Sequence, residues 1–182
     1  MKHIFLLSGQ SQHGKDSTAI FLKQKLQGST LIIHYADFLK FIAKNYMGWS
    51  GEKDIQGRTL LQQLGTERVK YELKKPLYWT ERVCDIIEIV YDKYDYFCIP
   101  DVRFVSEIHY PEARFPLKTT SIRVTRLNFD NGLTPEQKNH ISEKELMHYP
   151  HDFYITSESG LDKLEIEVDK FLQEFKNKNP LL

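Results

Sequence analysis

Gly9-Gln-Ser-Gln-His-Gly14-Lys15-Asp16-Ser17-Thr18 is the stretch of sequence that decides the fold. It follows an apolar run, residues 3–8, which predicts a strand buried on both faces, and it leads into a helical pattern. A turn between two glycines, followed by a lysine at a helix start, suits a polyphosphate, because backbone N–H groups, the helix dipole and the ammonium all face the anion. The spacing matches the P-loop, in which the position of Asp16 ordinarily holds Ser or Thr. We therefore predict a nucleotide-phosphate site directly after the first strand.

The composition is that of an ordinary globular protein. The chain has 182 residues, 41% apolar and 27% charged, with a formal net charge of zero, which gives no indication of a nucleic-acid or membrane surface. Cys84 and Cys98 lie in apolar surroundings without a CxxC pair, so we expect buried, reduced thiols. No apolar run approaches the roughly 18 residues of a membrane span, and no signal peptide is visible. We therefore expect a cytoplasmic protein.

Strand and helix patterns alternate through the rest of the chain. Further β-rich runs occur at residues 30–36, 96–101, 119–126 and 152–156, with helical periodicity between most of them. This alternation predicts a single α/β domain, 1–182, with the P-loop NTPase fold and a five-stranded parallel sheet flanked by helices. We assign residues 1–36, 96–127 and 151–182 to its core. In such sheets ligands bind beyond the carboxyl ends of the strands.

Two segments interrupt this core. Residues 37–95 show helical stretches from Arg58 to Leu73 and from Trp79 to Tyr91 without a strand pattern, which predicts a helical insertion. Residues 128–150 are polar and contain turn signals, so they predict a lid with one or two short helices. A lid would exclude water during phosphoryl transfer; a solvated helix with a serine cap is the alternative. The segment from Arg103 to Ala113 predicts a short helix, limited by Pro111.

Charged residues follow the strands where a ligand would bind. Asp37 and Asp101 stand at strand ends, where a carboxylate serves either as a magnesium ligand or as a helix cap. Guanidinium groups bind phosphate monoesters well, and the candidates are Arg58, Arg82, Arg103 and Arg126. Arg103 is the best placed of these because it stands beside Asp101. Trp79 could stack on a base, although an aromatic residue in a helical apolar stripe is more often part of the core.

Taken in order, these motifs resemble those of the bacteriophage-type deoxynucleoside monophosphate kinases, within the P-loop nucleoside monophosphate kinase fold. The motifs are Ser8-Gly9…Ser11…Gly14-Lys15-Asp16-Ser17-Thr18, Tyr35-Ala36-Asp37-Phe38-Leu39-Lys40, Arg58…Leu61-Gln62…Gly65-Thr66-Glu67, Trp79, Ile99-Pro100-Asp101-Val102-Arg103-Phe104…Glu107, Val124…Arg126, His140-Ile141-Ser142-Glu143…Leu146 and Asp152…Ile155…Ser157…Gly160…Leu164. The resemblance covers nearly the whole chain. It departs at Lys70, where the family leads us to expect an arginine.

The resemblance implies transfer of the γ-phosphoryl group of ATP to a deoxynucleoside 5′-monophosphate, with Mg²⁺, to give the diphosphate and ADP. It implies an ATP site at Ser11, Gly14, Lys15, Asp16, Ser17, Thr18, Thr156 and Ser157, and an acceptor site at Asp37, Arg58, Trp79 and Arg103. It places His140, Ser142 and Glu143 in the lid, and Lys15, Arg103 and Arg126 as catalytic residues. Asp16, Ser17 and Asp101 are its metal candidates, with Asp16 acting directly or through water. The resemblance is compatible with a homodimer, and with the host cytoplasm if the protein is phage-encoded.

Two other functions fit parts of this pattern. One is a P-loop kinase for another phosphorylated small molecule, such as phosphomevalonate, because the Gly-Lys-Asp form of the loop also occurs there. The other is a nucleotide-dependent switch, which needs little more than loops that respond to the γ-phosphate. A switch does not call for a large helical insertion and a separate lid over the same cleft, so the kinase interpretation is favoured.

Overall fold

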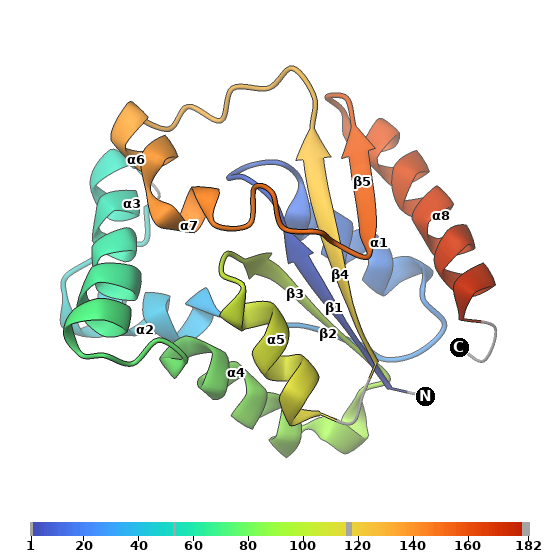
Figure 1. Cartoon of the computed structure of the whole chain (residues 1–182), viewed down its shortest axis with the longest axis horizontal. Helices are drawn as coiled ribbons and strands as arrows, with labels where there is room; N and C mark the ends of the chain where they lie inside the picture. The colour runs from blue at the N-terminus through green and yellow to red at the C-terminus, as the bar shows by residue number, and fades with distance from the viewer. Residues whose placement is uncertain (1, 53, 116–117, 180–182) are drawn as a thin grey trace.

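The fold is a five-stranded parallel sheet with helices on both faces (Figure 1). The computed structural model describes residues 2–52, 54–115 and 118–179. The strands are β1 His3–Ser8, β2 Thr30–Ile32, β3 Tyr96–Val102, β4 Lys118–Arg126 and β5 Phe153–Ser157. Their order is β2-β3-β1-β4-β5, and every pairing is parallel. The predicted fold class is confirmed; β2 alone is clearly shorter than predicted, because the chain enters the next helix at Ala36.

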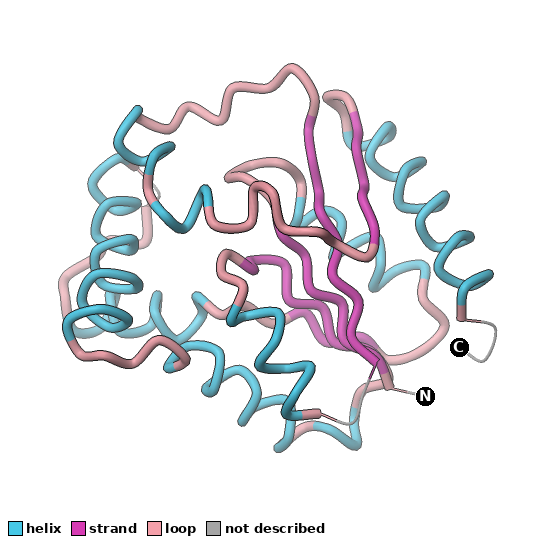
Figure 2. Tube along the Cα trace, in the orientation of Figure 1, coloured by secondary structure: helices cyan, strands magenta, loops and turns pink. Residues whose placement is uncertain are grey.

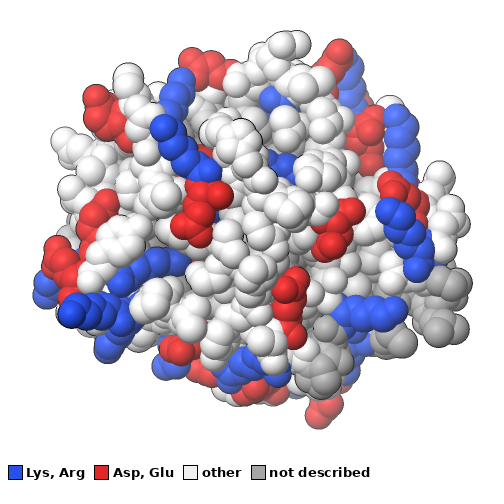
Figure 3. Space-filling model, in the orientation of Figure 1, with Lys and Arg blue, Asp and Glu red and all other residues white. Residues whose placement is uncertain are grey.

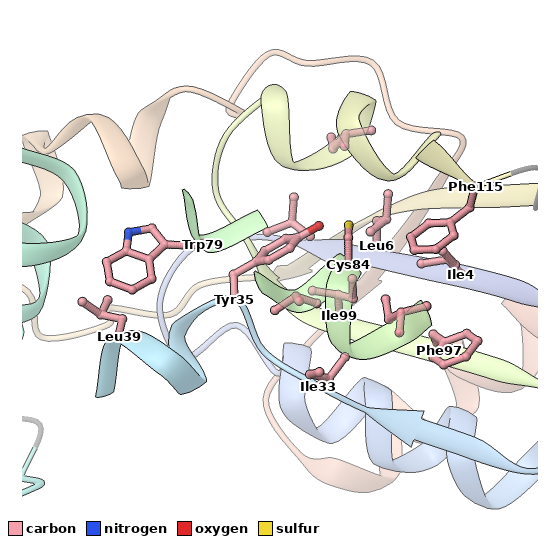
Figure 4. Packing of buried hydrophobic residues seen from close by; sticks show 14 of the residues in the cluster. Ile4, Leu6, Ile33, Tyr35, Leu39, Trp79, Cys84, Phe97, Ile99 and Phe115 are labelled. Carbon is pink, nitrogen blue, oxygen red and sulfur yellow. The ribbon is translucent and has the colours of Figure 1, made fainter. Parts of the chain in front are cut away.

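Alternate residues of β1 divide the core into two layers. Phe5 and Leu7 pack with α1 (Lys15–Lys25) and α8 (Leu161–Lys178) on one face of the sheet. Ile4 and Leu6 pack with α2 (Ala36–Tyr46), α4 (Tyr78–Ile89) and α5 (Ser106–Arg114) on the other, where Figure 4 shows the buried side chains. All four β1 side chains are at most 1% exposed, as expected for a central strand covered on both sides. Figure 2 shows the strands between these two helical layers.

The insertion consists of helices in its described part. After α2 come α3 (Ile55–Gln62), η1 (Gln63–Glu72), α4 and the short η2 (Tyr91–Lys93). The η1 segment is a π-helix, a rare form that is frequent at functional sites. It continues α3 without a break. The helix predicted from Arg58 to Leu73 is therefore present, with π-helical geometry from Gln63 onward.

The lid segment forms two short helices, as predicted. These are α6 (Pro135–Asn139) and α7 (Ile141–Lys144). They lie beside α3 (Figure 1), where the Gln137 side chain donates to the Ile55 carbonyl at 3.2 Å. The lid segment therefore contacts the insertion directly.

The short helix predicted from Arg103 to Ala113 is present as α5, which runs from Ser106 to Arg114 with Pro111 inside it. Proline cannot donate to the carbonyl four residues earlier, that of Glu107. Here the Tyr35 hydroxyl donates to that carbonyl at 2.8 Å, so a residue just before α2 satisfies the acceptor and Pro111 is tolerated inside the helix.

Several composition-based expectations can be compared with the structure. Cys84 and Cys98 are both buried and unbridged, and burial raises the pKa of each thiol to about 12, as expected for inert core cysteines. Among the described residues, no helix is long and apolar enough to cross a membrane. On the face seen in Figure 3, basic and acidic side chains are interspersed.

Candidate active site

One cavity of about 500 Å³ lies at the carboxyl ends of the strands, where the topology predicts a ligand. Its walls come from the P-loop, the start of α2, the insertion, the end of β3 and the lid. The lining residues include Ser11, Lys15, Asp16, His34, Leu39, Arg58, Thr66, Lys70, Trp79, Asp101, Arg103, Glu107, Ser142 and Glu143. Six of the residues predicted for the ATP and acceptor sites therefore line one cavity: Ser11, Lys15, Asp16, Arg58, Trp79 and Arg103.

Two glycines give the P-loop its shape. Gly9 has a φ of 149°, and a Cβ there would lie 2.3 Å from the Val124 carbonyl oxygen. Gly14 has a φ of 93° and caps α1 in the left-handed region. Thr18, buried in the first turn of α1 together with the half-buried Ser17, donates from its hydroxyl to the Gly14 carbonyl at 2.9 Å. The loop and the start of its helix are thus rigid and closely packed on β4.

Lys15 is buried among backbone carbonyls. Its ammonium donates to Gly9 O at 2.9 Å and to Gln10 O at 2.8 Å. Burial, followed by the nearby positive charge of Arg103, lowers the pKa of Lys15 to about 7. These neutral partners are ones that a phosphate oxygen could replace, which is the behaviour expected of a phosphate-binding lysine.

The arginines and the lid meet at the same loop. Arg58 donates to the Ser11 hydroxyl at 3.0 Å. Arg103 lies 2.6 Å from a Glu143 carboxylate oxygen and donates to Gly9 O at 3.3 Å. The other Glu143 oxygen accepts from the backbone N–H of Ser11 at 3.1 Å. Arg58, Arg103 and Glu143 therefore all reach the loop that follows β1.

The acidic candidates are linked by a histidine. His34 Nε2 lies 2.9 Å from Asp16 Oδ1, and His34 Nδ1 lies 3.4 Å from Asp37 Oδ2. Burial lowers the pKa of His34, but the hydrogen bonds to these two carboxylates outweigh it and raise the pKa to about 9. The imidazolium thus joins the P-loop helix to the start of α2.

Asp101 acts as a cap in this structure. Its two carboxylate oxygens accept from the backbone N–H groups of Tyr35 and Ala36, both at 2.9 Å. These amides belong to the start of α2, so the helix that is capped is a neighbour rather than the one following β3. Asp37, in the first turn of α2, accepts from the His34 N–H at 3.0 Å. The capping role that we left open is therefore realised for Asp101.

The far end of the cavity is mostly apolar. Trp79 is 4% exposed, packs in the core beside Leu39 (Figure 4), and donates from Nε1 to the Gly65 carbonyl at 2.9 Å. Because Trp79 also lines the cavity, the core and ligand interpretations of this residue hold together. The wall formed by Trp79, Leu39 and Leu61 is suited to a flat apolar group.

A buried ion pair stands in this apolar wall. Lys70 Nζ lies 2.9 Å from Glu107 Oε1, with side-chain exposures of 6% and 4%, and 3.5 Å from the centre of the Phe104 ring. The second Glu107 oxygen accepts from the N–H groups of Arg103 at 2.7 Å and Phe104 at 3.2 Å. Burial raises the pKa of Glu107, and Lys70 opposes this shift. The pair therefore fixes the backbone from which Arg103 reaches the P-loop.

The lid is also fastened to the insertion. His140 Nδ1 accepts from the backbone N–H of Ser142 at 3.2 Å, which leaves Nε2 as the donor to Glu67 Oε1 at 2.9 Å. Ser142 and Glu143 line the cavity from the same short helix. Of the three residues predicted for the lid, Ser142 and Glu143 therefore line the cavity, whereas His140 contacts the insertion.

Four other predicted residues lie elsewhere. Arg126 stacks 3.8 Å from the centre of the Phe129 ring and donates to the Ser159 hydroxyl at 3.2 Å, at the ends of β4 and β5. Thr156 is exposed and Ser157 is buried at the end of β5. Arg82 lies on α4, in an exposed ion pair with Asp85 at 3.0 Å. Arg126 is not among the residues that line the cavity containing Lys15, and its catalytic role stays a prediction.

Sequence reasoning missed His34, Glu67 and the pairing of Lys70 with Glu107. His34 directly precedes the Tyr35-Ala36-Asp37 motif at a strand end, and that position is a signal that could have singled it out. Lys70 and Glu107 are 37 residues apart, and no local pattern joins them.

Comparison with known proteins identifies a family model and several similar folds. The model described as deoxynucleotide monophosphate kinase matches residues 26–168, which begin after the P-loop. The structure of the Mycobacterium tuberculosis APS kinase CysC in complex with AMPPNP and APS is similar with a TM-score of 0.55 and 11% identity, over 94% of this chain and 98% of that one. A dephospho-CoA kinase from Campylobacter jejuni gives a TM-score of 0.54 and 16% identity, over 98% and 100%. At these identities the two structures establish a P-loop kinase fold alone, and no curated protein sequence matches.

Proposed function

The chain belongs to the deoxynucleotide monophosphate kinase family, and from that premise we propose how its residues carry out phosphoryl transfer. The protein is an ATP-dependent kinase whose acceptor is a deoxynucleoside monophosphate. The family match favours this acceptor over a phosphomevalonate-like compound, and it favours an enzyme over a switch. The proposal concerns which residues act, and in which role.

The observation that carries the proposal is the single cavity, with the P-loop lysine at one end and an apolar wall at the other. We assign the loop from Ser11 to Thr18 to the polyphosphate of ATP. The acceptor phosphate would lie between Arg58 and Arg103, and its nucleoside would lie against Trp79. This order places two anions side by side next to Lys15, as an in-line transfer requires.

The chemistry needs little beyond position and charge. A phosphate monoester is already an oxyanion near neutral pH, so no general base is required to activate it. Lys15 and the two arginines would neutralise the charge on the transferring group and align the two phosphates. The lid segment, which brings Ser142 to the cavity, would close it against water.

The donor set fits a magnesium ion that is shared with the substrates. Asp16 offers a carboxylate that is largely exposed, and Ser17 follows it on α1, whereas both Asp101 oxygens already accept backbone N–H groups. Among the described residues, no three acidic, histidine or cysteine side chains form a metal-binding group. Mg²⁺ is commonly held by one or two carboxylates together with substrate phosphates and water. We propose that Asp16, with Ser17, would hold it, and that Asp101 contributes less; bound there, Mg²⁺ would neutralise phosphate charge.

The adenine of ATP would lie near the ends of β4 and β5, outside the cavity described above. Arg126, stacked on Phe129, and the end of β5 at Thr156 and Ser157 lie beside one another. A guanidinium plane and an aromatic ring are surfaces on which a base can stack. In this proposal Arg126 binds the donor nucleotide rather than acting on the transferring phosphoryl.

Arg103→Ala tests the assignment of the acceptor site, with Arg82→Ala as the matched control on an exposed ion pair. We expect Arg103→Ala to raise the KM for the acceptor about 30-fold and the KM for ATP far less, because a charged hydrogen-bond donor is lost. Arg82→Ala should change neither value. Equal effects of Arg103→Ala on both substrates would contradict the acceptor role.

A further inference from the structure

Glu143 occupies a position where a phosphate group would bind. Its carboxylate is 8% exposed and touches two donors, the Ser11 N–H at 3.1 Å and the Arg103 guanidinium at 2.6 Å. An amide of the P-loop and an arginine over it are the two kinds of donor that hold phosphate oxygens. The Glu143 carboxylate of the lid thus occupies two hydrogen-bond donors that we assign to the substrate phosphates.

The surrounding charges favour an anion there. Lys15, Arg103 and Arg58 all reach the loop that contains Ser11. Bringing such cations together without an anion would be unfavourable because like charges repel in a partly dry site. The Glu143 carboxylate offsets this repulsion while the cavity holds no ligand.

A phosphate and this carboxylate cannot share the same donors. The Ser11 N–H offers one hydrogen, and two anions at that amide would repel each other. We propose that Glu143 is an internal competitor of the phosphate ligand, which holds Arg103 and the Ser11 amide in place and leaves when phosphate binds. This inference rests on the proposed phosphate site at the P-loop.

The proposal links ligand binding to the lid. Glu143 lies on α7. His140, the residue just before α7, is bonded to Glu67 of the insertion. Displacement of the carboxylate would therefore pull on the lid segment, which contacts both the P-loop and the insertion. A substitution that removes the negative charge should make phosphate binding tighter, whereas damage to a purely structural contact would make it weaker.

The test is the dissociation constant of inorganic tripolyphosphate, measured by calorimetry on the intact protein at low ionic strength without metal. We expect Glu143→Gln to tighten binding about tenfold, because a neutral amide holds the two donors less strongly than a carboxylate. The matched control is Glu145→Gln, two residues further on, where the carboxylate accepts from the Val105 N–H at 2.8 Å. The control should leave the dissociation constant unchanged.

Lys15→Ala separates the inference from the function on which it rests. If Lys15→Ala weakens tripolyphosphate binding while Glu143→Gln leaves it unchanged or weaker, the competitor role is overturned and the phosphate site stands. If Lys15→Ala has no effect, the phosphate site itself is wrong and the inference falls with it. Should Glu143→Gln fail to fold, Glu143→Asp serves instead. Its shorter side chain cannot span both donors, and absence of tightening there would also overturn the proposal.

Discussion

Two buried lysines line the same cavity, and their partners differ. Lys15, at the proposed phosphate end, donates to two backbone carbonyls of its own loop. Lys70, at the proposed nucleoside end, is paired with Glu107 and lies on the Phe104 ring. The first set of partners is neutral and can be exchanged for a ligand, whereas the second is a buried ion pair that a ligand would not replace.

The difference shows how the two ends are built. At the proposed phosphate end, the donors are backbone N–H groups and long cationic side chains, and each has a partner that phosphate could displace. At the nucleoside end, contacts such as that of Trp79 with the Gly65 carbonyl hold the wall together. Substitutions at the first end should therefore change catalysis and binding, and substitutions at the second should change stability first.

Lys15→Ala should produce the largest effect. We expect turnover to fall about 10³-fold or more, because a preorganised charge next to the transferring phosphoryl is lost. The free energy of unfolding should change little, since the lysine donates only to carbonyls of its own loop. An ADP-release assay and a urea titration measure the two quantities, with Lys23→Ala on the exposed face of α1 as control. Near-normal turnover of Lys15→Ala would contradict the claim that the two ends of the cavity differ in their effect on catalysis.

Lys70→Met should act on stability. Removing one partner of a buried pair leaves Glu107 uncompensated, and we expect a loss of about 3 kcal/mol in the free energy of unfolding. The double change Lys70→Met with Glu107→Gln should recover part of that loss, because no unpaired charge remains. Lys44→Met, on the exposed side of α2, is the control. A Lys70→Met protein with unchanged stability and normal kinetics would contradict the structural role of the Lys70–Glu107 ion pair.

Acidification should weaken the fixed part of the core. His3, at the base of β1, is bonded to the Thr120 hydroxyl at 2.8 Å, and burial, followed by Lys118, lowers its pKa to about 4. An unfolded histidine protonates near pH 6.5, so the folded state loses stability as the pH falls from 6.5 toward 4. We expect His3 to account for about 2 kcal/mol at pH 5. Unfolding curves at pH 7 and 5 should differ less for His3→Gln; an equal difference would contradict the assignment.

Trp79→Phe should have the smallest effect. It tests whether Trp79 both packs in the core and contacts the nucleoside of the acceptor. Loss of the Nε1 bond should cost about 1 kcal/mol of stability, and the KM for the acceptor should rise about fivefold as the ring area falls. Trp49→Phe is the matched control, because Trp49 also donates from Nε1 to a carbonyl, that of Glu52, at 2.9 Å. The control should lose similar stability with no change in KM. Equal KM values for both variants would place the nucleoside elsewhere.

The fold could be predicted from local patterns, because each strand and its following turn carry their own signal. The buried run before Gly9 and the lysine after Gly14 predicted a phosphate site, and the strand ends singled out Asp101 and Arg103. The contact that satisfies the Glu107 carbonyl beside Pro111 could not be predicted, because its donor, Tyr35, lies in a distant segment of the chain. The partners of Lys70 and Glu143 could not be predicted from the sequence either, because the packing of distant segments decides which charged side chains come into contact.

The central claim is transfer of phosphoryl from ATP to a deoxynucleoside monophosphate in this cavity. It is tested most directly with ATP labelled in the γ-phosphoryl group, incubated with the protein, Mg²⁺ and each deoxynucleoside monophosphate in turn, with phosphomevalonate as a further acceptor. We predict that the label appears in a deoxynucleoside diphosphate and that Lys15→Ala abolishes this product. Label found only in inorganic phosphate, or in diphosphomevalonate, would contradict the claim.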